Sequence, residues 1–227
     1  MDKKPFVPAL PYGAYLFDFD GTLVDSMPAF VSVMLRILDE KGMTYDKEII
    51  KIITPLGCTG TARYYREMGL DEPEEAIIAR MHQYAIPAYR DTIPAKEGVA
   101  ETLRALKASG CSLHVLTASP HPMLDPCLKR LGLWELFDNV WSCEDFKTTK
   151  SDPEIYRRAA AQIGLPMEQI LFLDDNYNAD RAAREAGMAV CGVFDPTSAD
   201  YEAEIRAVSH HYIRQFSELL RDQSDRL

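Results

Sequence analysis

The 227-residue sequence lacks long hydrophobic runs and a recognisable leader segment. No run approaches the roughly 20 consecutive apolar residues that a membrane-spanning helix requires, so we expect no membrane association. Residues 1–13 contain three prolines and no continuous apolar stretch, which is unlike a secretory signal peptide. We therefore expect a cytoplasmic protein.

Paired cysteines and an excess of basic charge are also missing. The five cysteines are spaced irregularly and include no C-x-x-C pair, which argues against a disulfide framework and against a zinc site. Lys and Arg number 25 against 35 Asp and Glu, for a net charge of −10. Nucleic-acid binding needs a clustered basic face, so we expect no nucleic-acid partner but a small molecule. We expect a monomer or a weak dimer.

The apolar pattern predicts two structural parts. Between residues 26 and 92 the spacing indicates helices only, interrupted by proline and glycine turns. From residue 98 onward, predicted helices alternate with predicted strands, which indicates a parallel sheet covered by helices. The predicted helices cover residues 28–41, 47–53, 61–68, 74–89, 99–109, 122–131, 153–163, 179–186 and 212–220. The predicted strands cover residues 15–17, 112–117, 140–141, 170–173 and 188–193.

This pattern predicts an α/β protein. Residues 1–25 and 93–227 should form a Rossmann-like parallel sheet with helices on both faces. Residues 26–92 should form a small all-helical domain inserted after the first strand. In open sheets of this kind, ligands bind at the carboxyl ends of the strands.

Two carboxylates follow the first predicted strand directly. Asp18 and Asp20 stand two residues apart, immediately before Gly21. As a strand unwinds into a loop, this spacing can aim an attacking carboxylate and a proton donor into one cleft. A turn held by aspartate side chains is the alternative interpretation of the same residues.

The run DFDGTLVDS, residues 18–26, matches the first signature of the haloacid dehalogenase-like superfamily, whose phosphatases carry D-x-D-G-T. LTAS at residues 116–119, KSDPE at 150–154 and LDDN at 173–176 resemble the second, third and fourth motifs, in the family's order. The resemblance covers residues 14–194 and places the helical insertion where the family has its type-1 cap. It implies a Mg²⁺-dependent hydrolase of the phosphatase or β-phosphoglucomutase-like branch.

The resemblance also implies roles for individual residues. Asp18 is the expected nucleophile, Asp20 the general acid and base, and Thr117 a donor to the phosphoryl group. Two unit charges 4 Å apart repel by about 4 kcal/mol at an effective dielectric near 20, so a carboxylate that attacks a phosphate needs cations beside it. Lys150 and Mg²⁺ are the expected cations, with Lys147 as the competing lysine. The expected metal-binding residues are Asp18, Asp20 through its backbone carbonyl, Asp175 and, with its role left open, Asp174.

Substrate contacts are expected from Gly21, Ala118 and Ser119. Residues 54–63, TPLGCTGTAR, should form a glycine-rich loop facing the core, with Arg63 as a candidate anion-binding residue or an exposed helix-opening charge. Further candidates are weaker. They are His121 as a substrate contact, Asp180 as a helix cap, His82 and His114 as packed side chains, and His210 and His211 as surface side chains.

Several other activities are less consistent with these residues. An acidic Asp20 argues against a dehalogenase and a phosphonatase. A β-phosphoglucomutase normally presents a cap histidine where this chain has Phe30 and an arginine where it has about Gly60, so hydrolysis is favoured. The motif order argues against a phospho-aspartate receiver, and no expected catalytic residue is missing, as it would be in a degenerate binding module.

Overall fold

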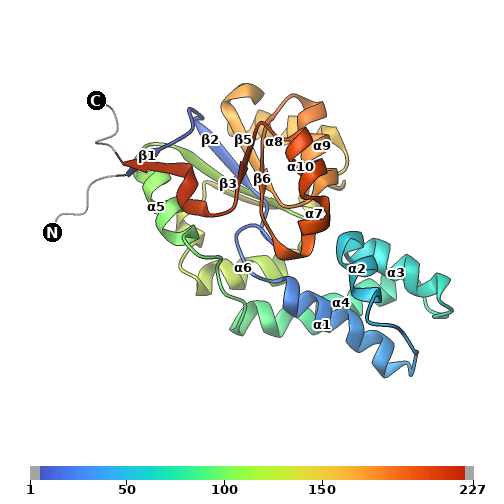
Figure 1. Cartoon of the computed structure of the whole chain (residues 1–227). Helices are drawn as coiled ribbons and strands as arrows, with labels where there is room; N and C mark the ends of the chain where they lie inside the picture. The colour runs from blue at the N-terminus through green and yellow to red at the C-terminus, as the bar shows by residue number, and fades with distance from the viewer. Residues whose placement is uncertain (1–5, 223–227) are drawn as a thin grey trace.

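The computed structural model describes residues 6–222 and contains two sheets (Figure 1). The main sheet has six parallel strands in the order β4-β3-β2-β5-β6-β7. These strands are β2 (Ala14–Phe17), β3 (Ser112–Thr117), β4 (Asn139–Ser142), β5 (Ile170–Asp174), β6 (Ala189–Val193) and β7 (His211–Ile213). A separate antiparallel pair joins β1 (Phe6–Pro8) to β8 (Leu220–Asp222). The predicted parallel sheet is confirmed.

Helices cover both faces of the main sheet. Tyr15 and Phe17 of β2 pack in the same cluster as residues of α5 (Val99–Ala108) and α6 (His121–Arg130). Leu16 points to the opposite face and packs with α8 (Pro153–Ile163) and α9 (Tyr177–Ala186). All four residues of β2 are buried, as expected for a central parallel strand covered on both sides. The predicted α/β fold, with its helical insertion after the first strand of the sheet, is therefore confirmed.

The insertion consists of α1 (Met27–Glu40), α2 (Ile49–Ile53), α3 (Gly57–Glu67) and α4 (Glu74–Asp91), with a 3-10 turn, η1 (Thr54–Leu56), before α3. Helix α4 packs against α1, α3 and α6. The apolar core of the insertion continues into the core beside α6, with Tyr89 and Phe19 stacked at the junction. Figure 1 shows these helices grouped at the opposite side of the molecule from β1 and β8.

The predicted helix over residues 212–220 is wrong. This segment contains β7, a 3-10 turn, η5 (Phe216–Leu219), and the start of β8. Ile213, Phe216 and Leu219 are buried at three-residue intervals, which imitates a helix, but β7 pairs with β6 and β8 pairs with β1. Strand pairing with distant segments decides the conformation here. Helix α10 (Glu202–Val208) and β1 were not predicted.

The predicted glycine-rich loop over residues 54–63 is also wrong, because η1 leads directly into α3 at Gly57. Glycines at residues 57 and 60 lower the helix propensity of this segment, so the sequence does not predict that α3 starts at residue 57. The predicted helix over residues 61–68 therefore starts four residues too late, and the remaining predicted elements agree with the structure to within about two residues at each end. The core also contains four short elements. They are the 3-10 turns η2 (Trp134–Leu136), η3 (Met167–Gln169) and η4 (Pro196–Tyr201) and the short helix α7 (Cys143–Phe146).

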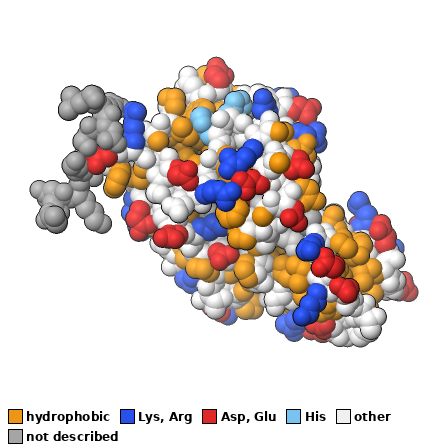
Figure 2. Space-filling view, viewed as in Figure 1, with side chains coloured by type: hydrophobic (Ala, Val, Ile, Leu, Met, Phe, Trp, Pro, Cys, Tyr) orange, Lys and Arg blue, Asp and Glu red, His pale blue; other side chains and the backbone are white. Residues whose placement is uncertain are grey.

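The surface carries charges of both signs. Figure 2 shows Lys and Arg interspersed with Asp and Glu on the visible face, without a large basic patch there. All five cysteines are free thiols, of which four are buried and Cys58 is half-buried. Within residues 6–222, no helix combines the length and the apolar character needed to cross a bilayer.

Candidate active site

The topology of the sheet brings the motif residues to one edge. Phe17, the last residue of β2, lies beside Val115 of β3 and Leu173 of β5. The backbone N–H of Asp18 donates to the carbonyl of Leu173 at 2.8 Å, so the two chains stay paired one residue past the strand. The side chains that follow β2, β3 and β5 therefore meet at the carboxyl edge, where ligands bind in such sheets.

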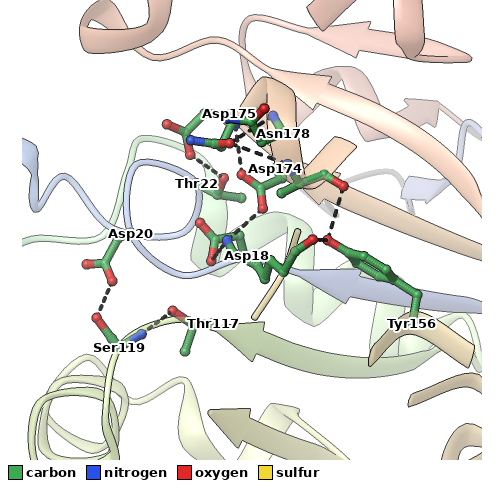
Figure 3. Close-up of polar contacts among 12 residues, drawn as sticks. Asp18, Asp20, Thr22, Thr117, Ser119, Tyr156, Asp174, Asp175 and Asn178 are labelled. Carbon is green, nitrogen blue, oxygen red and sulfur yellow. Dashed lines mark hydrogen bonds and ion pairs between the residues drawn. The ribbon is translucent and has the colours of Figure 1, made fainter. Parts of the chain in front are cut away.

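Three carboxylates form a compact buried cluster there. Asp18, Asp174 and Asp175 each offer an oxygen within 4.8 Å of the others (Figure 3). The Thr22 hydroxyl donates to Asp175 Oδ1 at 3.0 Å, and the Asn176 N–H donates to Asp174 Oδ1 at 2.8 Å. Burial raises the pKa of all three carboxyl groups, and for Asp174 burial and the charge of Asp18 raise it to about 7.

Lys150 is the cation of this cluster. Its Nζ lies 2.6 Å from Asp18 Oδ1 and 2.7 Å from Asp174 Oδ2. Burial alone would lower the pKa of Lys150, but the two carboxylates raise it well above the ordinary value, so the ammonium stays charged. The hydroxyl of Tyr156 donates to the Lys150 carbonyl at 2.8 Å and holds the backbone of this residue. The competing Lys147 is exposed.

The cluster fits a divalent cation. Three buried carboxylates face one ammonium group, so the site carries an excess of negative charge that a cation would offset. Hard oxygen donors of this kind suit a small divalent metal. Asp18, Asp174 and Asp175 are the side chains that would hold it.

Gly21 allows the loop after β2 to approach this cluster. Its φ is +75°, and a Cβ added there would lie 2.6 Å from Asp175 Oδ2. A larger residue would therefore displace the Asp175 carboxylate. Lys96, which the sequence did not reveal, donates from Nζ to the Gly21 carbonyl and to the Phe194 carbonyl at 3.0 Å, and it pairs with Asp195 at 2.8 Å.

Asp20 has a different environment from the acidic cluster. The Ser119 hydroxyl donates to its Oδ2 at 2.5 Å, and the Tyr89 hydroxyl donates to its Oδ1. Figure 3 shows Asp20 and Ser119 together, apart from Asp175 and Thr22. Tyr89 is fully buried near the end of α4 and lies 69 residues from Asp20 in sequence, so sequence reasoning missed this contact.

The remaining motif residues line a cavity of about 910 Å³ between the sheet edge and the helical insertion. Thr117, Ala118 and Ser119 all line it, and Thr117 Oγ1 accepts a hydrogen bond from the Ser119 N–H at 3.1 Å. Arg63 is not brought to this cavity. Its side chain is 64% exposed, and its Nε lies 3.8 Å from a carboxylate oxygen of Glu74.

Asp180 is not the helix cap that we expected. Asn176 caps α9 by accepting from the N–H groups of Asn178 and Ala179. Asp180 is instead fully buried behind the acidic cluster, where burial, followed by the charges of Asp174 and Asp175, raises its pKa well above the ordinary value. The hydroxyl of Ser209 lies 3.5 Å from its Oδ2.

The histidines lie at varied distances from the cavity. His82 is half-buried and lines it, whereas the ring of His121 lies between Asp125 and Asp145, at 2.8 and 2.9 Å, outside the cavity lining. His210 is exposed, and His211, the first residue of β7, is half-buried.

Comparisons with known proteins agree with this geometry. A family model described as haloacid dehalogenase-like hydrolase matches residues 12–187. Pyrophosphatase PpaX of Bacillus velezensis is 28% identical over 183 residues, which cover 79% of this chain and 82% of that protein. Phosphoglycolate phosphatase of Salmonella choleraesuis is 29% identical over 202 residues, covering 78% and 79%. The structure of CbbY from Rhodobacter sphaeroides in complex with xylulose-(1,5)bisphosphate superposes with a TM-score of 0.79 at 23% identity, covering 92% and 96%, and supports the fold alone.

The segment matched by the family model contains all four motifs. In the structure, those motifs meet at one edge of the sheet, and the predicted class of enzyme is confirmed. The chain belongs to the haloacid dehalogenase-like hydrolase family.

Proposed function

We propose that this protein is a Mg²⁺-dependent phosphatase that hydrolyses a small phosphomonoester through an aspartyl-phosphate formed on Asp18. The observation that carries the proposal is the separation of two carboxylate environments on one loop. Asp18 lies against Lys150 and the acidic cluster, whereas Asp20 is held by two hydroxyl groups beside the same cavity. The names of the two curated relatives, a pyrophosphatase and a phosphoglycolate phosphatase, support a small phosphorylated substrate, and the second name supports a phosphomonoester.

In the first step, a carboxylate oxygen of Asp18 attacks phosphorus and the bond to the leaving oxygen breaks. Asp20 gives its proton to that oxygen, so the product leaves as a neutral alcohol. In the second step, Asp20 takes a proton from water as the water oxygen attacks phosphorus, and Asp18 is released as a carboxylate. Mg²⁺, held by Asp18, Asp175 and the Asp20 carbonyl with Asp174 as a further oxygen donor, would supply positive charge beside the phosphoryl oxygens.

Other residues of the cavity would hold the phosphoryl group. Thr117 offers its hydroxyl group, whereas the hydroxyl of Ser119 already donates to Asp20. Backbone N–H groups near Asp20 and Ala118 offer further donors that suit phosphoryl oxygens. Lys150 offsets the charge of Asp18 as the anionic phosphate approaches. We infer that residues 26–92 act as a cap over the core of residues 1–25 and 93–227. We also infer that a single chain contains the complete active site and that the protein works in the cytoplasm.

Hydrolysis is favoured over a mutase reaction by the cap side of the cavity. Phe30 lines it where a mutase normally presents a histidine. A Cβ at Gly60 would lie 2.8 Å from the Leu56 Cβ, so an arginine cannot replace Gly60 without displacing η1. The two reactions differ in product. With Mg²⁺, at least one member of a panel of sugar phosphates, phosphoglycolate and nucleotides should release inorganic phosphate, and accumulation of an isomerised sugar phosphate alone would overturn the proposal.

Replacing Tyr89 by phenylalanine should lower kcat about tenfold and change KM little. The substitution removes one of two donors to Asp20, and a hydrogen bond to a charged group contributes about 1.5–3 kcal/mol. The ring and its stacking on Phe19 remain, so the fold should persist. Steady-state phosphate release gives both constants.

Tyr84→Phe is the matched control for this prediction. Tyr84 lies on the same helix, and its hydroxyl donates to Glu40 at 2.7 Å on the surface. It should retain the wild-type kcat. Equal kcat values in the two variants would remove Tyr89 from the positioning of Asp20.

Mg²⁺ should raise the melting temperature of the protein by about 5–10 °C at one hundred times its dissociation constant. Such an excess adds about 2.7 kcal/mol, and about 2–4 °C follows from each kcal/mol in a chain of this size. Because burial and Asp18 raise the pKa of Asp174 to about 7, the metal-free fold binds more protons than the unfolded chain. Its stability should therefore fall as pH rises from about 4 to 7, and Mg²⁺ should reduce this fall.

Thermal unfolding with Mg²⁺ and with EDTA measures both effects. Asp175→Asn should lose the Mg²⁺ shift, whereas Asp71→Asn in the exposed turn before α4 should keep it. The same shift in both variants would show that the ion binds elsewhere.

A further inference from the structure

The cavity wall opposite the acidic cluster is largely apolar. Side chains of α1, η1, α3, α4 and α6 form it, and all of them are uncharged. They are Met27, Phe30, Leu56, Cys58, Ile78 and Met123. A substrate that extends from the phosphoryl group toward the helical insertion would lie against this wall.

Positive charge is scarce in the cavity. Among residues 6–222, Lys150 is the one Lys or Arg that lines the cavity, and it already pairs with Asp18 and Asp174. Burial lowers the pKa of His82 below its ordinary value, despite the nearby charge of Glu144, so the imidazole is uncharged at neutral pH. Glu144 itself adds a negative charge to the lining. Outside the acidic cluster and Lys150, the lining of the cavity is therefore neutral to negative.

An anionic leaving group would lose hydration in such a cavity without gaining a cationic partner. Burying an unpaired carboxylate or phosphate is costly, whereas a neutral hydroxyl group needs a single hydrogen bond. The hydroxyl groups of Thr54, Thr59 and Ser198 line the cavity and can supply such bonds. A volume of about 910 Å³ admits a leaving group well above the size of a two-carbon acid.

We propose that the substrates are phosphomonoesters of neutral alcohols that carry an apolar portion, with one phosphate and no second anionic group. This inference rests on the proposed phosphatase function. A leaving group with a carboxylate or a second phosphate should bind poorly, because no Lys or Arg among the described residues lies in the cavity wall opposite the acidic cluster.

Two isosteric pairs of substrates test the inference. 4-Carbamoylphenyl phosphate differs from 4-carboxyphenyl phosphate, and sorbitol 6-phosphate from 6-phosphogluconate, chiefly by the charge of the leaving group. The neutral member of each pair should have a kcat/KM at least about tenfold higher. Equal values, or a preference for the anionic members, would overturn the inference while leaving the phosphatase function intact. A failure of all four compounds to release phosphate would count against the phosphatase function itself.

Dissociation constants test the inference independently of turnover. Calorimetry with Asp18→Asn and Mg²⁺ should give tighter binding for the neutral member of each pair. Equal dissociation constants would contradict the proposed role of the wall.

Substitutions that change a charge test whether the lining of the cavity causes the preference for neutral substrates. Ile78→Lys places a cation in the wall and should change the ratio of kcat/KM for the neutral and the anionic substrate about tenfold in favour of the anionic one. Glu144→Gln removes an exposed negative charge from the lining and should change this ratio about twofold in the same direction. Ile52→Lys is the control, because Ile52 is 43% exposed on α2 and lies outside the cavity lining. An equal shift in the control would attribute the effect to net charge and overturn the inference.

Discussion

Replacing Asp18 by asparagine is expected to reduce phosphate release by at least about 10⁴-fold, because loss of a catalytic nucleophile removes the covalent route altogether. The carboxamide is isosteric with the carboxylate but is a much poorer nucleophile. The substitution also removes one of three charges from the buried cluster, so the fold should not lose stability. Lys150 also contacts Asp174, at 2.7 Å, and the substitution does not alter either of these side chains.

Phosphate release and rapid acid quench measure this effect. The wild-type chain should carry a phosphate adduct at residue 18 during turnover, and the variant should carry none. Asp71→Asn makes the same chemical change in an exposed turn and should retain wild-type turnover. Wild-type activity in Asp18→Asn would exclude Asp18 as the nucleophile.

Lys150→Met should lower kcat by about 10²–10³-fold and destabilise the fold by about 3–5 kcal/mol. The substitution leaves the carboxylates of Asp18 and Asp174 buried without the ammonium that contacts both. Loss of one member of a buried ion pair leaves an uncompensated charge, and here one lysine serves two carboxylates. Urea unfolding gives the stability, and phosphate release gives the rate.

Two further variants separate charge balance from catalysis. Lys147→Met removes the exposed neighbouring lysine and should leave both quantities near wild type. Lys150→Met combined with Asp174→Asn removes one of the orphaned charges, so it should regain part of the stability but little of the rate. If Lys147→Met lost as much activity as Lys150→Met, the lysine of the third motif would be wrongly assigned.

Local chemistry explains which elements could be predicted. Helix α8 begins at Pro153 after the Asp152 cap and ends before Gly164, so both of its boundaries stand in the sequence. Strand β3 contains three apolar residues, Leu113, Val115 and Leu116, and ends in the polar Thr117, and it was predicted to the residue. The chain after residue 201 has no comparable signals, and its strands form only because β6 and β1 offer free edges.

The candidate site divides in the same way. Asp18, Thr117 and Asp174 each end a strand or follow one directly, and the parallel order of β3, β2 and β5 was enough to expect them together. Their catalytic roles remain predictions. Arg63 shows the opposite case, because its position near a helix start could not reveal that its side chain points to Glu74 instead of the cavity.

Motif spacing and apolar periodicity thus determined the family, the α/β sheet and the residues at the strand ends, because each depends on neighbours within a few positions along the chain. Tertiary packing alone decided that Tyr89 donates to Asp20, that Lys96 holds the loop of Gly21, and that Asp180 lies buried behind the acidic cluster. It also decided that the cavity presents apolar side chains from the helical insertion and one exposed carboxylate, Glu144, from α7. These features join segments far apart in sequence, and hydrogen bonds and burial depend on the direction of each side chain in the folded chain.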